Sequence, residues 1–241
     1  MKMMEFFRGE KKKLKELSPG KRAEYIIDYY KGAILALILL LAFLISSVIA
    51  DFTAKKTVLS GFLLDSYYAL GQDDPFYDFE TYAGINQSQE DTEFYPNLIL
   101  YDNTDTTAQQ LYSAIVAGQT DFITGNGSTF LRFSYESFRY VTDLREILTT
   151  EQLDELSNRL FYVDASLLET LDTQNGTVYL PDHDKPELME QPVPVGINIK
   201  GFRGVDELYP AEEYVFFAVV SNAPHTDMVA TFLEYLFSEV E

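Results

Sequence analysis

The chain has 241 residues, no cysteine and a formal net charge of −20. Without disulfides the folded part must rely on its own apolar core, which suits a bacterial cell surface better than a eukaryotic secreted protein. Nucleic-acid binding requires a basic face, which so acidic a chain does not offer, and we therefore expect no nucleic-acid partner.

An uncharged stretch of nineteen residues runs from Gly32 to Ala50, between Lys31 and Asp51. As a helix rising about 1.5 Å per residue it would measure roughly 28 Å, close to the thickness of a bilayer's hydrocarbon core. A buried core helix would carry more polar positions than Ser46 and Ser47. We therefore predict a transmembrane helix over residues 32–50, with its cytoplasmic extension beginning at Ser18 and Pro19, which are typical of a helix start.

The charges on the two sides of this stretch differ in sign. Residues 1–31 carry nine Lys/Arg and five Asp/Glu, whereas residues 51–241 carry nine Lys/Arg and thirty-three Asp/Glu. Basic residues beside a membrane helix stay in the cytoplasm. The sequence thus predicts a single-pass protein of the cell membrane, with a basic cytoplasmic tail over 1–31 and an extracytoplasmic domain over 51–241.

The anchor could in principle be a removable signal peptide, because residues 48–50 resemble a small-residue cleavage site. The charged region before the apolar run is about thirty residues long, and the run itself exceeds the usual 7–15 residues of a signal peptide. We expect an uncleaved signal anchor.

Beyond residue 51, segments with strand patterns alternate with segments of helical periodicity. We expect strands over residues 57–65, 97–101, 121–124, 161–163, 177–180, 192–199 and 214–220. We expect helices over residues 73–82, 106–118, 130–138, 150–159 and 226–240. Such alternation is typical of an α/β domain with a mostly parallel sheet, and the continuous apolar run at 214–220 indicates a strand buried on both faces.

Side chains suited to catalysis are few. His183 lies in an Asp-His-Asp run, residues 182–184, which would need a distant third ligand to hold a metal ion, and the simpler interpretation is a solvated acidic turn. Ser221 lies close to His225 in sequence, but nothing resembles a nucleophile elbow. We predict that the protein is not an enzyme and has no metal or cofactor.

Two loops that follow predicted strands are the candidate ligand-binding segments. The first comprises Gly125, Asn126, Gly127, Ser128 and Thr129, and the second Ser221 and Asn222. A glycine-rich turn between a strand and a helix exposes backbone N–H groups, and open α/β sheets bind ligands there. It lacks the lysine of a phosphate loop, so a nucleotide is not indicated. The alternative is a tight strand–helix connection without a ligand; if both strands are central, the loops would face each other across a cleft.

Several short motifs also follow one another in a suggestive order. A helix ending at Gly118 precedes a strand with Asp121, Phe122 and Ile123, a small-residue loop and a short helix; Asp143, Leu144 and Leu148 then precede a strand with Phe161, Tyr162 and Asp164. This order, and the closing helix after residue 221, resembles extracellular solute-binding proteins of bacterial ABC importers, with the type II periplasmic-binding fold. The resemblance covers about residues 57–241 and implies that Asn126, Ser128 and Ser221 are pocket residues.

The chain is shorter than such binding proteins and has no cysteine for a lipid anchor, so the resemblance implies a reduced second lobe. We expect the domain to capture or sense a small solute or peptide at the membrane, within reach of neighbouring membrane proteins. The alternative is a non-catalytic structural or accessory subunit of a membrane complex, with a degenerate cleft.

Overall fold

The computed structural model describes residues 17–53, 55–68, 75–100, 106–136, 138–168 and 182–238. The predictions for residues 1–16, for the start of the 73–82 helix and for the 177–180 strand lie outside these described residues. The chain divides into two compact units, Met1–Ala54 and Lys55–Glu241.

The described part of the first unit is helix α2 (Pro19–Thr53). It begins as predicted, because the backbone N–H of Arg22 donates to the carbonyl oxygen of Ser18 at 2.9 Å. Its longest uninterrupted run of described side chains covers residues 31–46. A span takes about 20 apolar residues, and in the described part of the chain no helix is long and apolar enough to be one. For the described residues, the prediction of a transmembrane helix over 32–50 is therefore contradicted.

The second unit is built on one six-stranded sheet with the strand order β2-β1-β3-β6-β5-β4. The strands are β1 (Lys56–Leu64), β2 (Glu90–Leu98), β3 (Phe122–Asn126), β4 (Leu160–Asp164), β5 (Pro192–Asn198) and β6 (Val215–Val219). β1 pairs in parallel with β2 and β3, whereas the pairs β3–β6, β6–β5 and β5–β4 are antiparallel.

The α/β class is thus as predicted, but the mostly parallel sheet is wrong, because the sheet is mixed. A parallel pair needs a crossover, usually made by a helix that packs across the sheet. Between β5 and β6 the only helix is α8 (Val205–Leu208), which has four residues. The chain therefore returns beside β5 in the opposite direction.

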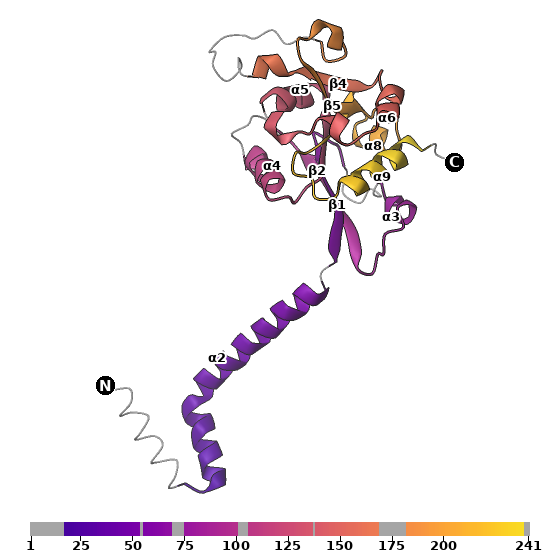
Figure 1. Ribbon diagram of the computed structural model, residues 1–241. Coiled ribbons are helices and arrows are strands. Elements are labelled where there is room, and N and C mark those ends of the chain that lie inside the picture. The colour runs from indigo at the N-terminus through magenta and orange to yellow at the C-terminus, as the bar shows by residue number, and fades with distance from the viewer. Residues whose placement is uncertain are drawn as a thin grey trace. The chain divides into compact units, whose positions relative to one another are not determined.

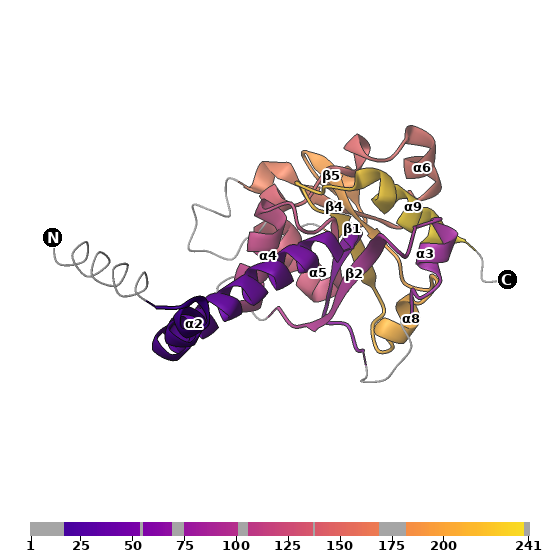
Figure 2. The same cartoon turned by 90° about the horizontal axis from the view of Figure 1, so that it is seen from below.

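Helices cover both faces of the sheet in three layers. α4 (Thr106–Val116) and α5 (Gly127–Glu136) lie on one face, and α3 (Phe79–Tyr82), α6 (Thr150–Glu155), α8 and α9 (Thr226–Phe237) lie on the other (Figures 1 and 2). Each face has its own apolar cluster of buried side chains. All five residues of β6 are buried, which confirms the strand buried on both faces.

Phenylalanine rings fill the cluster between the sheet and α9. The ring of Phe122 stacks on Phe217 and on Phe232, with centroid distances of 4.7 and 5.2 Å. Gly61 on β1 makes room for it, because a Cβ atom there would lie 2.2 Å from Cζ of Phe122. This packing fixes α9 on the sheet and so positions the surface that α9 shares with α6.

One strand differs clearly from its prediction. β2 ends at Leu98, where the predicted strand over 97–101 had barely begun. Its residues include three acidic side chains and Pro96 and are half-buried or exposed. Charges and proline are typical of edge strands, where they discourage pairing with other chains, and they hide the strand from an apolar pattern.

Candidate functional site

The two predicted ligand-binding loops lie at opposite ends of the sheet. β3 and β6 are antiparallel, so Asn126 at the end of β3 is opposite Val215 at the start of β6. Ser221 and Asn222 follow the far end of β6. A five-residue strand at about 3.3 Å per residue separates the two loops by about 17 Å. The expected cleft between them is therefore wrong, because it required the two strands to point in the same direction.

The first loop forms the junction between β3 and α5. Gly125 is buried in β3, and Gly127 is the first residue of α5. Oδ1 of Asn126 accepts hydrogen bonds from the backbone N–H of Thr129 and the hydroxyl of Ser128, both at 3.0 Å. Asn126 is therefore the N-cap of α5, and its amide oxygen is already engaged; Ser128 is the exposed member of the group.

The second loop caps another helix. Nδ2 of Asn222 donates to the carbonyl oxygens of Ile115 and Val116, at 3.3 and 3.2 Å, in the last turn of α4. The backbone N–H of Ser221 donates to the carbonyl oxygen of Tyr140 at 3.0 Å, while its side chain is exposed. Both predicted loops thus use their polar groups to end or begin helices.

A buried polar group next to the second loop joins three elements. Asp121, which is fully buried, accepts hydrogen bonds from the backbone N–H groups of Ser60 (2.8 Å) and His225 (2.7 Å). Nδ1 of His225 lies 3.1 Å from Oδ2 of the same carboxylate. Among the described residues no serine hydroxyl is hydrogen bonded to His225, as a triad would require. Asp121 therefore ties β1 and β3 to the start of α9.

A second polar group lies at the carboxyl ends of β1 and β3, where ligands bind in open α/β sheets that change winding direction. Asp65 directly follows β1 and has a positive φ of 54°, which is uncommon for a residue with a side chain. Its carboxylate accepts a hydrogen bond from the hydroxyl of Thr129. Nearby, the hydroxyl of Tyr209 lies 2.8 Å from Oγ1 of Thr124 and donates to the carbonyl oxygen of Leu64 at 2.9 Å. Burial raises the pKa of Tyr209.

The sequence patterns did not predict Asp65 and Tyr209 as site residues. An aspartate at the end of the predicted strand over 57–65 was the available signal for the first. No local signal marks Tyr209, which is 85 residues from its partner Thr124.

His183 packs among aromatic rings. It stacks on Phe161 with 4.7 Å between ring centroids. Burial lowers the pKa of His183, although Asp184 and Asp182 oppose the shift. Asp182 pairs with Lys185 at 2.5 Å. Over the part of the chain that the structure describes, no three metal-binding side chains are grouped so that they could hold an ion.

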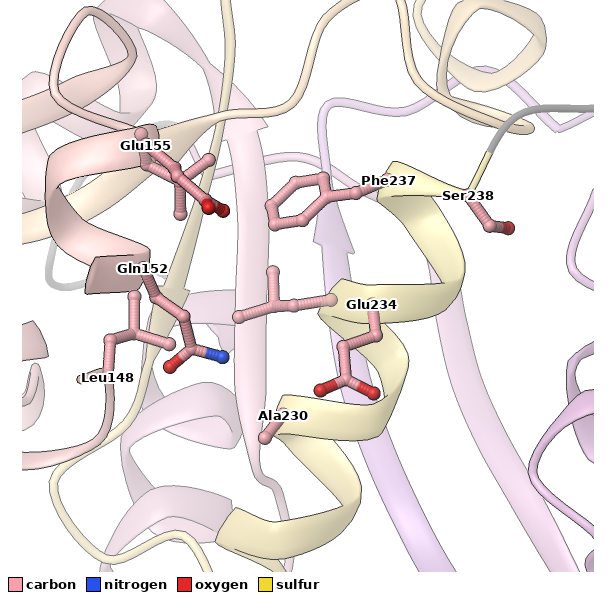
Figure 3. Close-up of a pocket in the computed structure, with 9 residues that line it drawn as sticks. Leu148, Gln152, Glu155, Ala230, Glu234, Phe237 and Ser238 are labelled. Carbon is pink, nitrogen blue, oxygen red and sulfur yellow. The ribbon is translucent and has the colours of Figure 1, made fainter.

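A surface hollow of about 360 Å³ lies between α6 and α9 (Figure 3). Its floor is formed by the buried side chains of Leu148, Leu156 and Leu233. The remaining lining residues stand around the opening; they are Gln152, Glu155, Ala230, Glu234, Phe237 and Ser238. Figure 3 shows that Gln152 and Glu155 project from α6 toward α9.

A second hollow of about 360 Å³ adjoins the first at Ala230, which lines both. It lies between the segment around the short helix η2 (Leu144–Glu146) and the start of α9. Its other lining residues are Thr142, Glu146, Ile147, Val220, Ser221, Ala223, Thr226 and Asp227. We call the two hollows together the α9 groove. Of the predicted site residues, Ser221 alone lines it.

The rim of the α9 groove is acidic. Four exposed carboxylates line it, those of Glu146, Glu155, Asp227 and Glu234, and no lysine, arginine or histidine is among the lining residues. None of the four forms an ion pair with another described residue. The nearby guanidinium of Arg145 is paired with Asp143 at 2.5 Å. The groove thus combines the apolar floor of the first hollow with a more polar second hollow and with unpaired negative charge along both.

Comparisons with known proteins found no relative of this chain. No protein family, curated protein or solved structure matches the chain. The resemblance to solute-binding proteins stays a prediction.

Proposed function

We propose that residues 55–241 form a non-catalytic interaction domain that binds a protein partner in the α9 groove. The observation that carries this proposal is the combination of an apolar floor with unpaired carboxylates on both walls of the groove. Buried leucines at the bottom of an open groove offer anchor sites for apolar side chains, and polar residues at the rim provide orientation.

Polar residues near the two predicted loops already form internal hydrogen bonds, and this favours the α9 groove as the binding surface. Asn126 and Asn222 cap helices, and Asp121 is fully buried with three hydrogen bonds. A ligand at these positions would have to displace an internal hydrogen bond, which would leave a protein group unpaired. The carboxylates of the α9 groove form no ion pair with a described residue, so a partner can bind them without breaking one.

Capture of a small solute is a second candidate, favoured by the position and backbone conformation of Asp65. It lies where open α/β sheets bind ligands, and non-glycine residues held at positive φ cluster at functional sites. The six described strands form one sheet, so the solute would bind at an open edge. A thermal-shift screen of the protein with sugars, amino acids and short peptides tests this; a stabilising compound should lose its effect in Asp65→Asn.

Site-specific photo-crosslinking tests the interaction domain directly. A benzophenone amino acid is placed at Gln152, on the α6 wall of the groove, in cells that naturally make the chain. Illumination should give one discrete adduct. Ala230→Trp, which fills the point shared by both hollows, should reduce the adduct about tenfold, the change that corresponds to 1.4 kcal/mol of binding free energy.

The matched control is Gln110→Trp, which adds the same side chain to the exposed face of α4 on the other side of the sheet. This variant should leave the adduct at position 152 unchanged. An adduct that persists in Ala230→Trp, or that forms equally well with the benzophenone at Gln110, would contradict binding in the groove.

A further inference from the structure

We infer that the partner of the α9 groove presents a cationic amphipathic helix, an inference that rests on the proposed interaction function. The juxtaposition behind it is an apolar floor between two helices with carboxylates on both walls. Three features of the groove lead to this class of partner: its direction, its length and its charge.

The direction of the groove follows the axis of α9. The positions of α9 and its C-cap that line the groove are 226, 227, 230, 233, 234, 237 and 238, a spacing of three and four residues. This is the period of one face of a helix, so the groove runs along the helix instead of crossing it. A partner that follows the same line can place apolar residues at positions i, i+4 and i+7, as in helix-in-groove recognition.

The length of the groove also fits a short helix. Twelve residues of α9 at about 1.5 Å per residue give about 18 Å. That length matches about three turns of a partner helix, whose apolar side chains would enter the first hollow while its basic side chains reach the more polar second hollow. A single small apolar molecule would occupy one hollow and leave the other empty.

The charge of the partner follows from the rim. Glu155 and Glu234 stand on opposite walls of the first hollow, and Glu146 and Asp227 stand around the second. Lysine or arginine residues beside the apolar face of a partner helix would reach these carboxylates, and such complementarity speeds association and selects against acidic partners. The net charge of −20 on the whole chain attracts cations in general, so the test must separate the rim from the rest of the surface.

Three model peptides provide the probe. The first is an amphipathic helix of leucine and lysine, the second replaces every lysine by glutamate, and the third scrambles the first so that it has no apolar face. Their binding to the full-length protein is measured by fluorescence anisotropy at low and high salt. A neutral detergent is present because large apolar side chains of α2, from Leu35 to Ile45, are exposed. The peptides in the same detergent without protein give the background from binding to micelles, and Ala230→Trp should lower the signal that remains above it.

We expect the leucine–lysine helix to bind at least about tenfold more tightly than the other two peptides. Glu155→Gln with Glu234→Gln should weaken binding about fivefold at low salt and less at high salt, because exposed ion pairs are modest and screened. The control is Glu207→Gln with Glu213→Gln, which changes the net charge equally at two exposed positions outside the groove. It should change the affinity less than about twofold, the scale of one weak exposed ion pair.

Three results would overturn the inference. Equal weakening by the rim variant and by its control would mean that the peptide responds to net charge alone. Failure of the leucine–lysine helix to bind, while the crosslink at Gln152 remains sensitive to Ala230→Trp, would leave the interaction function standing with a partner of other chemistry. Loss of both signals would remove the proposed function as well.

Discussion

Two regions of this protein carry clusters of polar residues, and they use them differently. At the carboxyl end of β3, Asn126 caps α5 and Thr129 is bonded to Asp65. Along α9, Glu155 and Glu234 stand at an apolar groove without an ionic partner among the described residues. The first region satisfies its hydrogen bonds internally, whereas the second leaves its charges open to a partner.

The difference shows why residue type alone does not identify a binding site. Glycine, asparagine and serine after a strand are equally suited to bind a ligand and to start a helix. What separates the two roles is whether the polar atoms are already paired. The following variants test this contrast, in order of decreasing effect on the free energy of unfolding.

The largest effect is expected at Asp121, next to the second predicted loop. Asp121→Ala leaves the buried N–H group of Ser60 and the partly buried N–H group of His225 without their acceptor, and each unsatisfied group costs about 1–3 kcal/mol. We expect the free energy of unfolding to fall by about 3 kcal/mol in urea denaturation followed by circular dichroism. Ser221→Ala, at an exposed side chain nearby, serves as the control. A loss below about 1 kcal/mol would argue against a structural role for this carboxylate.

A smaller loss is expected from the N-cap of α5. Asn126→Ala removes the acceptor for the N–H of Thr129 and should lower the free energy of unfolding by about 1 kcal/mol. Ser128→Ala should have little effect, because its hydroxyl is a donor at an exposed position. If Asn126→Ala left stability unchanged, the side chain would be free for a ligand after all.

His183 should make stability depend on pH. Its ring lies near Tyr214, which neighbours Gly127, and burial lowers its pKa below the ordinary 6.5. The unfolded chain then binds the proton more readily, so this contribution is complete above pH 6.5 and is lost as the pH falls toward the folded-state pKa. His183→Phe keeps an aromatic ring and should flatten this part of the stability curve. An unchanged slope would place the titration elsewhere.

The smallest effect is expected in the α9 groove. Glu155→Gln with Glu234→Gln breaks no ion pair with a described residue, so thermal and urea unfolding should change by no more than about 0.5 kcal/mol. A large loss of stability would mean that these carboxylates hold the fold together, and that the contrast between the two regions is false.

Much of the fold could be predicted from the sequence because the relevant signals are local. The apolar period and Gly118, which has a φ of 63°, mark the helix that ends at Val116. The continuous apolar run marks β6. The direction of β6 could not be predicted, because a strand buried on both faces has the same pattern whichever way it runs. Because β6 runs antiparallel to β3, Ser221 and Asn222 lie at the opposite end of the sheet from Asn126.

The candidate site was harder to predict because it is made by tertiary contacts. Asp121 and His225 are 104 residues apart in the chain. Leu233 and Phe237 lie within the helix predicted over 226–240, but the sequence alone could not show that α6 would stand beside them and leave a groove. In the sequence, the acidic residues at 227 and 234 have the pattern of any solvated helix face, and only the residues that pack beside them make them part of a groove.

Hydrogen exchange of the full-length protein with the leucine–lysine helix tests the central contrast most directly. Peptide binding should slow exchange along residues 144–156 and 226–238, which form the two walls of the α9 groove. Residues 122–129, whose polar groups are paired internally, should exchange at the same rate with and without peptide. Protection centred on residues 122–129, with none along α9, would contradict the account.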